Sequence, residues 1–144
     1  MNTGSNRRQV WIVVAVIAAI ALLIAIIAIA STSPSPRPFI GANYQCNFDP
    51  TRVDSVECDS SDSPRVVAAA IARNVSPIDQ RTGSDGTIYM QYSDDIIAVE
   101  PESYGSEIEV DDYNRGYAKH STYIGIFGWS STRPGGSGFG GFGK

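Results

Sequence analysis

The sequence has one histidine, two cysteines and few basic residues after its first thirty positions. The formal net charge is −4, and Arg7 and Arg8 are the only charges before residue 31, so the rest of the chain carries −6. A domain of that sign has no electrostatic attraction for a phosphate backbone, which excludes a nucleic-acid partner. The glycines form neither a P-loop nor a dinucleotide-binding motif, so we expect no nucleotide cofactor.

Residues 10–30 contain no charged, polar, Gly or Pro residue. At a helical rise of ~1.5 Å per residue, about twenty such residues span the ~30 Å of hydrocarbon in a bilayer. We therefore expect a transmembrane helix that contacts membrane lipid. The positive charges of Arg7 and Arg8 predict a cytoplasmic stub over residues 1–9 and place the remainder outside the cell membrane, in a single-pass topology.

A cleavable signal peptide is the alternative interpretation of this segment. Ala28-Ile29-Ala30 has the small-x-small form that signal peptidase accepts, and cleavage after Ala30 would give a secreted protein. The apolar run is longer than the usual ~7–15 residues of a signal peptide, which favours an uncleaved anchor. Both interpretations place residues 31–144 outside the cytoplasm.

Composition divides the rest of the chain into three parts. Residues 31–38 read STSPSPRP, and their prolines predict an extended stalk. Residues 130–144 are dominated by Gly and cannot bury enough surface to offset their conformational entropy, so we expect a disordered tail. Residues 39–129 are left to form one small extracytoplasmic domain.

Cys46 and Cys58 are predicted to form a disulfide, because an even pair of cysteines in a small exported domain is most simply bonded. Closing a loop of about a dozen residues stabilises a fold by ~3 kcal/mol. A metal site or a catalytic thiol is the alternative, and either would have to use His120 as its partner. We expect neither a metal nor a cofactor.

Local patterns predict an α+β domain with one helix on a three- to four-stranded antiparallel meander. Ser63 and Pro64 form a start signal for a helix that ends near Asn74, with Val66, Val67, Ala70 and Ile71 on its inner side. Three runs rich in β-forming residues, separated by turn residues, predict strands; they span 87–92, 96–100 and 107–111. A turn at 114–116 predicts a fourth strand that begins near Tyr117.

The third strand carries the most suggestive cluster of residues. Ile108 and Val110 alternate with Glu107, Glu109 and Asp111, and this alternation predicts a sheet with one dry and one solvated face. Together with Asp112, the three carboxylates form a candidate interaction face for a basic partner, such as an envelope protein or wall polymer. A hard cation is the alternative ligand, although strand neighbours on one face stand nearly 7 Å apart.

His120 is the sole candidate for a catalytic base. A hydrolase acting on wall polymers would need it beside a carboxylate such as Asp94, Asp111 or Asp112, and no catalytic spacing surrounds it. We therefore expect no enzymatic activity and a hydrogen-bonded or surface histidine. The leading hypothesis is an interaction or structural module of the bacterial cell envelope, with a cation- or ligand-binding sensor and a hydrolase as alternatives.

Several short motifs carry a resemblance to a known family; they are Tyr92-Ser93-Asp94-Asp95, Tyr104-Gly105-Ser106, Asp111 to Tyr117 and His120. With the glycine-rich end that follows them, they resemble an uncharacterised bacterial family of short membrane-anchored proteins, the domain of unknown function numbered forty-two forty-seven. The resemblance covers most of residues 63–129. It implies an envelope protein without an assigned activity, so no functional residues carry over.

Overall fold

The computed structural model describes residues 10–20, 34–49 and 51–134, which fall into two separate units, Met1–Pro34 and Ser35–Lys144. In the first unit, residues 10–20 form a helix. No helix of the described residues has both the length and the apolar character that a membrane crossing needs. Residues 1–9 of the predicted stub and 21–30 of the predicted membrane segment lie outside the described residues.

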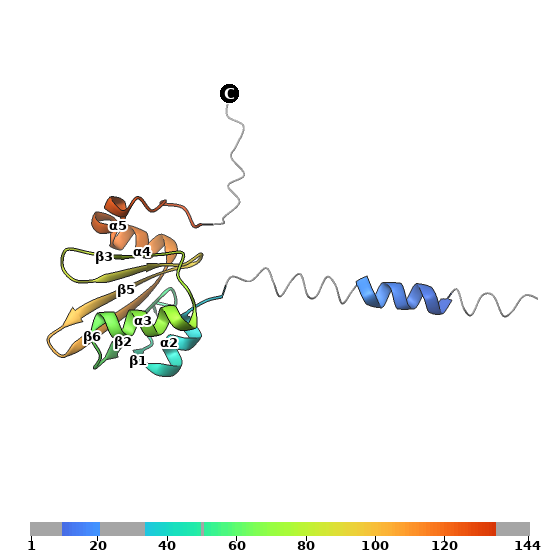
Figure 1. Cartoon of the computed structure of the whole chain (residues 1–144), viewed down its shortest axis with the longest axis horizontal. Coiled ribbons are helices and arrows are strands. Elements are labelled where there is room, and N and C mark those ends of the chain that lie inside the picture. Colours follow the sequence, from blue (N-terminus) through green and yellow to red (C-terminus); the bar gives the residue numbers. More distant parts are fainter. Residues whose placement is uncertain (1–9, 21–33, 50, 135–144) are drawn as a thin grey trace, which may run out of the picture. The chain divides into compact units, whose positions relative to one another are not determined.

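The second unit is built on a six-stranded antiparallel sheet of order β1-β2-β6-β5-β4-β3 (Figure 1). The strands are β1 (Gln45–Asn47), β2 (Ser55–Ser60), β3 (Asp79–Thr82), β4 (Ile88–Gln91), β5 (Asp95–Glu102) and β6 (Gly105–Asp112). The α+β class and the predicted meander are confirmed, since β4, β5 and β6 are consecutive neighbours in the sheet. The expected strand number is too low, because β1, β2 and β3 extend the meander on both sides.

One face of the sheet is covered by α2 (Arg37–Asn43) and α3 (Pro64–Asn74). The start of α3 is as predicted, with Ser63 as N-cap and Pro64 in the first turn. Its buried side chains are Val67, Ala68 and Ile71, whereas Val66 is half exposed, so the expected inner side of the helix is wrong by part of a turn. The buried side chains of α3 pack on the sheet and form the larger core with Ile97, Val99, Ile108 and Val110.

The opposite face is partly covered by α4 (Tyr113–Lys119) and α5 (Ser121–Phe127), on the far side of the sheet from α3. A second core forms there around Tyr89, Ile96, Tyr113 and Ile124. The predicted fourth strand near Tyr117 is therefore wrong. Asp112 caps α4 by accepting a hydrogen bond from the backbone N–H of Asn114, which starts a helix where the sequence suggested a turn.

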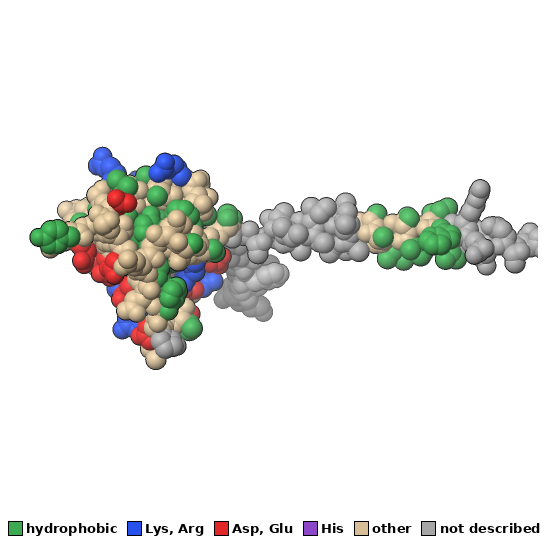
Figure 2. Space-filling view, turned by 90° about the horizontal axis from the view of Figure 1, so that it is seen from below, with side chains coloured by type: hydrophobic (Ala, Val, Ile, Leu, Met, Phe, Trp, Pro, Cys, Tyr) green, Lys and Arg blue, Asp and Glu red, His purple; other side chains and the backbone are tan. Residues whose placement is uncertain are grey.

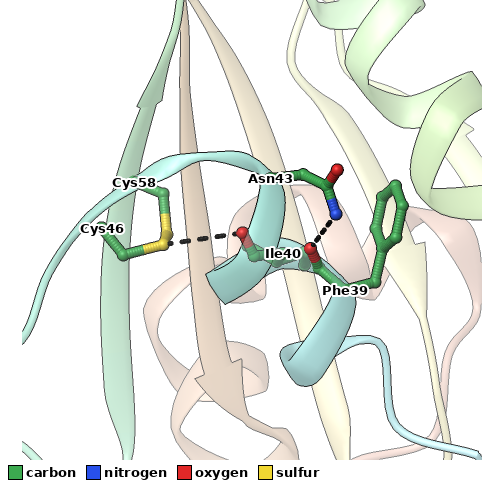
Figure 3. The surroundings of a disulfide bond; sticks show 5 residues. All are labelled: Phe39, Ile40, Asn43, Cys46 and Cys58. Carbon is green, nitrogen blue, oxygen red and sulfur yellow. Dashed lines mark hydrogen bonds between the residues drawn. A yellow bond between two sulfur atoms is a disulfide. The ribbon is translucent and has the colours of Figure 1, made fainter.

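The predicted disulfide is confirmed: Cys46 of β1 and Cys58 of β2 are directly paired across the two strands and bonded. Figure 3 shows this bridge under α2, where Cys46 Sγ lies 3.9 Å from the carbonyl oxygen of Ile40. Asn43 Nδ2 donates to the Phe39 carbonyl oxygen at 2.8 Å in the same helix. The bridge thus ties the short edge strand β1 to the body of the sheet.

The predicted boundaries of the stalk and the tail both differ from those of the structure. Arg37 and Pro38 begin α2 instead of ending a stalk, because proline suits the first turn of a helix. Arg37 Nε also donates to Asp95 Oδ1 at 2.7 Å, which anchors the start of the unit to β5. At the other end, the Tyr113 hydroxyl donates to the carbonyl oxygen of Ser130. Residues 31–33 and 135–144 lie outside the described residues.

Candidate functional site

The strand register places seven carboxylates on the face of the sheet that α4 and α5 partly cover. We call this set the acidic face: Glu57 and Asp59 of β2, Glu100 and Glu102 of β5, and Glu107, Glu109 and Asp111 of β6. Partners in an antiparallel sheet point to the same side, so the predicted row on β6 is extended onto both neighbouring strands. The expectation that β6 has one dry and one solvated face is wrong for two of its three carboxylates, because Glu109 and Asp111 are buried.

Glu109 is buried in contact with two cationic or ionisable side chains from the junction of α4 and α5. Lys119 Nζ donates to Glu109 Oε1, and His120 Nε2 lies 2.9 Å from Glu109 Oε2. Burial by itself raises the pKa of Glu109, but the hydrogen bonds from His120 and Lys119 outweigh it and lower that pKa. The side chain of Lys119 is half exposed and that of His120 is only 10% exposed. Both contact the Glu109 carboxylate, whose side chain is 4% exposed.

Asp111 is the less satisfied of the two buried carboxylates. Neither of its oxygens accepts a hydrogen bond among the described residues, and its nearest cation is Arg115, whose Nε is 3.3 Å from Oδ1. Burial raises the pKa of Asp111. The helix above it approaches closely because Gly116 has no side chain: a Cβ there would lie 3.2 Å from Asp111 Cβ and 2.8 Å from Ile96 Cβ.

His120 is held from two directions. Besides its contact with Glu109, its ring meets Tyr89 edge to face, with ring centroids 5.3 Å apart. Burial, followed by the charge of Asp85, raises the pKa of Tyr89 to about 12. The tyrosine that contacts the His120 ring is therefore neutral at physiological pH. The sequence indicated only that His120 was unique, and nothing in its spacing from Glu109 revealed this pairing.

The carboxylates proposed for a hydrolase are not brought together with His120. Arg133 contacts both Asp94 and Asp112, with 3.2 Å between Arg133 Nη1 and Asp94 Oδ1. Asp112 also caps α4, and its side-chain parity on β6 is opposite to that of the other three residues of the predicted interaction face, so the structure separates it from them. His120 faces Glu109 instead, a partner that the hydrolase hypothesis did not include.

The part of the acidic face beyond α4 and α5 remains accessible. Glu57, Asp59 and Glu102 are exposed, and Glu100 and Glu107 are partly exposed. Glu107 has Asp59 directly opposite on one side and Glu100 directly opposite on the other. We call Asp59, Glu107 and Glu100 the acidic row. Among the described residues no Lys or Arg forms an ion pair with any of the three, whereas Arg52 lies 3.8 Å from Glu57.

Among the described residues, one group has the composition and spacing for a metal ion: Glu100, Glu109 and His120. One ligand atom of each lies within 4.8 Å of those of the other two. The predicted set of Glu107, Glu109 and Asp111 does not form such a group within the described part of the chain.

A separate cavity of about 390 Å³ lies near the disulfide, on the other face of the sheet. Ile40, Cys46, Val56 and Val110 contribute apolar walls, and Arg37 and Arg52 are among its polar lining residues. Sequence reasoning gave no indication of it, because its walls come from segments that were expected to be stalk and loop.

Comparison with known families identifies one match, to the model described as Domain of unknown function (DUF4247), over residues 23–142. The chain belongs to this family. The resemblance inferred from the turn motifs is thus correct, and the DUF4247 match includes the whole sheet with its acidic face and His120. No curated protein and no solved structure matches the chain.

Proposed function

We propose that this DUF4247 protein is a membrane-anchored, extracytoplasmic interaction module of the bacterial cell envelope, and that its acidic face binds a basic partner. The observation that carries the proposal is the acidic row. Like charges directly opposite one another in a sheet are destabilising, and Glu107 has one on each side. A partner that supplies Lys, Arg or amine groups would remove this repulsion on binding.

The electrostatics of Glu107 support the same interpretation. Its pKa is raised, first by partial burial and then by the charges of Glu57, Glu100, Glu102 and Glu109. A surface in which carboxylates raise one another's pKa has a negative potential that attracts cationic groups and accelerates their encounter. Acidic side chains in red are visible on the domain surface in Figure 2.

The cover provided by α4 and α5 defines the accessible area. These helices bury the aromatic end of the face around Tyr89 and Ile124 but leave Asp59, Glu102 and Glu107 open to solvent or nearly so. A partner therefore meets carboxylates at the strand ends of β2, β5 and β6. A basic segment of an envelope protein fits this chemistry, as does a wall polymer with amine groups.

The proposed location in the cell envelope depends on the N-terminal segment. Hydrophobic side chains cover the helix of residues 10–20 (Figure 2), and Trp11 is 71% exposed on it. An apolar helix with exposed side chains is suited to lipid rather than to water. The disulfide supports the proposed compartment, because such bonds persist in oxidising surroundings.

We propose binding without catalysis. Asp94 and Asp112 are engaged with Arg133, and His120 with Glu109. Among the described residues no hydrogen bond joins the third candidate carboxylate, Asp111, to His120. A calcium sensor built on Glu107, Glu109 and Asp111 is also a weaker candidate, since calcium takes six to eight oxygen ligands and two of these carboxylates are buried under helices.

Photo-crosslinking in cells tests this proposal. A photoreactive phenylalanine analogue replaces Glu102, which is exposed on the acidic face, and in a matched control it replaces Ala69, which is exposed on α3. We expect a distinct crosslinked adduct from position 102 that disappears in the double variant Asp59→Lys/Glu107→Lys. The same adducts from both positions, or an adduct that survives charge reversal, would contradict the proposal.

A further inference from the structure

We infer that Glu100, Glu109 and His120 form a binding site for a divalent transition-metal ion, with zinc as the best-suited class. The three side chains come from β5, β6 and the junction between α4 and α5. Their ligand atoms lie within 4.8 Å of one another, so small side-chain movements bring all three to the ~2.0–2.2 Å that zinc requires. This inference goes beyond the proposed function, since it concerns a metal ion and needs no macromolecular partner, although Glu100 belongs to both sites.

The contact between Glu109 and His120 shows where the ion would sit. Glu109 Oε2 and His120 Nε2 are 2.9 Å apart. With the ring proton on Nδ1, the Nε2 lone pair is free for a metal ion, and the two atoms separate by a few tenths of an ångström to become ligands. Lys119 contacts the other oxygen of Glu109, Oε1, and does not occupy this position.

The surroundings favour a cation. Glu57 and Glu107 are direct neighbours of Glu109 and Glu100 across the sheet, and Asp111 follows on the same face of β6. Asp111 is buried, and neither of its oxygens has a hydrogen-bond partner among the described residues. The opposing cations are Lys119, Arg115 and Arg52, which pairs with Glu57. Five carboxylates against three cations leave a negative local charge, which lowers the free energy of a bound divalent ion.

The ligand set selects the type of metal. One imidazole nitrogen and two carboxylate oxygens are borderline to hard donors, which suit zinc and its neighbours in the first transition row. Calcium takes six to eight oxygens, and the cluster supplies only two carboxylates. Three protein ligands leave one tetrahedral position for water or for a donor group of a binding partner.

The supporting shell is already rigid. The edge-to-face contact with Tyr89 fixes the ring of His120, and the cover of α4 and α5 confines Glu109. Both ligands are at least nine-tenths buried as side chains, at 4% and 10% exposed. Prearranged ligands lose little conformational entropy on binding, which favours a defined site over a chance surface contact.

Titration of the full chain in detergent with zinc chloride tests this inference. The affinity tag is removed first, so that no tag histidine contributes, and calorimetry measures affinity and stoichiometry. We expect one zinc ion per chain, a higher melting temperature with zinc and no response to calcium. Absence of zinc binding at 100 μM metal would overturn the inference.

Variants locate the site. His120→Ala and Glu100→Gln should each weaken zinc binding at least tenfold. Glu102→Gln is the matched control, because Glu102 is on the same strand and face but outside the cluster, and its affinity should stay within twofold of wild type. Unchanged affinity in His120→Ala would place the metal elsewhere and overturn the inference.

Lys119→Ala separates a metal site from a structural ion cluster. Removal of a positive charge next to the ion should strengthen zinc binding severalfold, whereas loss of a merely structural contact would weaken or not change it. Metal-free circular dichroism of every variant shows whether it is folded. Glu100 is only partly buried, and glutamine has nearly the same shape as glutamate. The Glu100→Gln variant therefore tests the site even if His120→Ala does not fold.

Discussion

Glu109 and Asp111 lie two residues apart on the same face of β6 and both are buried, but within the described part of the chain only Glu109 has hydrogen-bonding partners. The contrast appears in their pKa values, lowered for Glu109 and raised for Asp111. The side chains of α4 and α5 thus compensate the charge of Glu109, whereas burial under these helices makes ionisation of Asp111 unfavourable. The rest of the face is the surface that we propose as a binding site.

Asp111→Asn should stabilise the fold at neutral pH. Because the folded pKa of Asp111 is above its ordinary value of 3.8, ionisation costs folding free energy, so the wild type loses stability as pH rises through the raised pKa. We expect a gain of about 1 kcal/mol in the free energy of unfolding at pH 7, measured by urea denaturation with EDTA present.

The gain should shrink as pH falls and vanish below the ordinary pKa of aspartate, where the carboxyl is protonated in both states. A variant that is less stable than wild type at pH 7 would show that Asp111 is a paired, stabilising carboxylate. A gain that persists at acid pH would show that it does not come from the ionisation of Asp111.

Gly116→Ala should destabilise the domain. The added Cβ would lie 2.8 Å from Ile96 Cβ, so α4 must move away from the sheet, at a cost of about 1–3 kcal/mol. Gly125→Ala in α5 is the matched control: nothing lies within 4 Å of its Cβ, and alanine favours a helix by about 0.5–1 kcal/mol. Thermal melts that order the two variants the other way would disprove the close approach of α4.

Much of the domain follows from local signals in the sequence. Ser63 and Pro64 mark the start of α3 through capping chemistry, and the alternation around Ile108 predicts the strand. The disulfide follows from the even number of cysteines in a domain that was expected to be exported to an oxidising compartment. These features depend on near neighbours or on a general rule, so one sequence is sufficient to find them.

The missed features depend on what packs from elsewhere. Tyr and Ile favour strands, and this preference concealed the helical spacing of Tyr113, Gly116, His120 and Ile124 in α4 and α5. Alternation assigned Glu109 and Asp111 to one face but gave no information about the helices that cover it. The Glu109–His120 contact joins two elements whose packing no local pattern specifies.

Glu107→Gln should stabilise the isolated protein, since it removes the central charge of the acidic row. We expect about 0.5 kcal/mol at low salt, with a smaller gain at 0.5 M NaCl, where screening weakens the repulsion. Glu102→Gln serves for comparison, because Gly105 lies directly opposite Glu102. Glu102 also raises the pKa of Glu107, but from a position that is not directly paired with it, so its substitution should give a smaller gain. Equal effects of the two substitutions in urea denaturation would show that the row is not electrostatically coupled.

Reduction of the disulfide should destabilise the domain and release β1. The bond closes a loop with a sequence separation of 12 residues, which predicts a loss of about 3 kcal/mol. Urea denaturation with and without reductant measures this loss, and the Cys46→Ser/Cys58→Ser variant should reproduce it. A variant as stable as the oxidised wild type would mean that the bridge contributes nothing to folding.

The proposed envelope function depends on the claim that the domain lies outside the cytoplasm. A dual reporter fused after Lys144 tests this claim directly. Alkaline phosphatase is active only outside the cytoplasm, whereas a fluorescent protein matures inside it. The account predicts phosphatase activity without fluorescence. Fluorescence without phosphatase activity would place the acidic face in the cytosol and contradict an extracytoplasmic role.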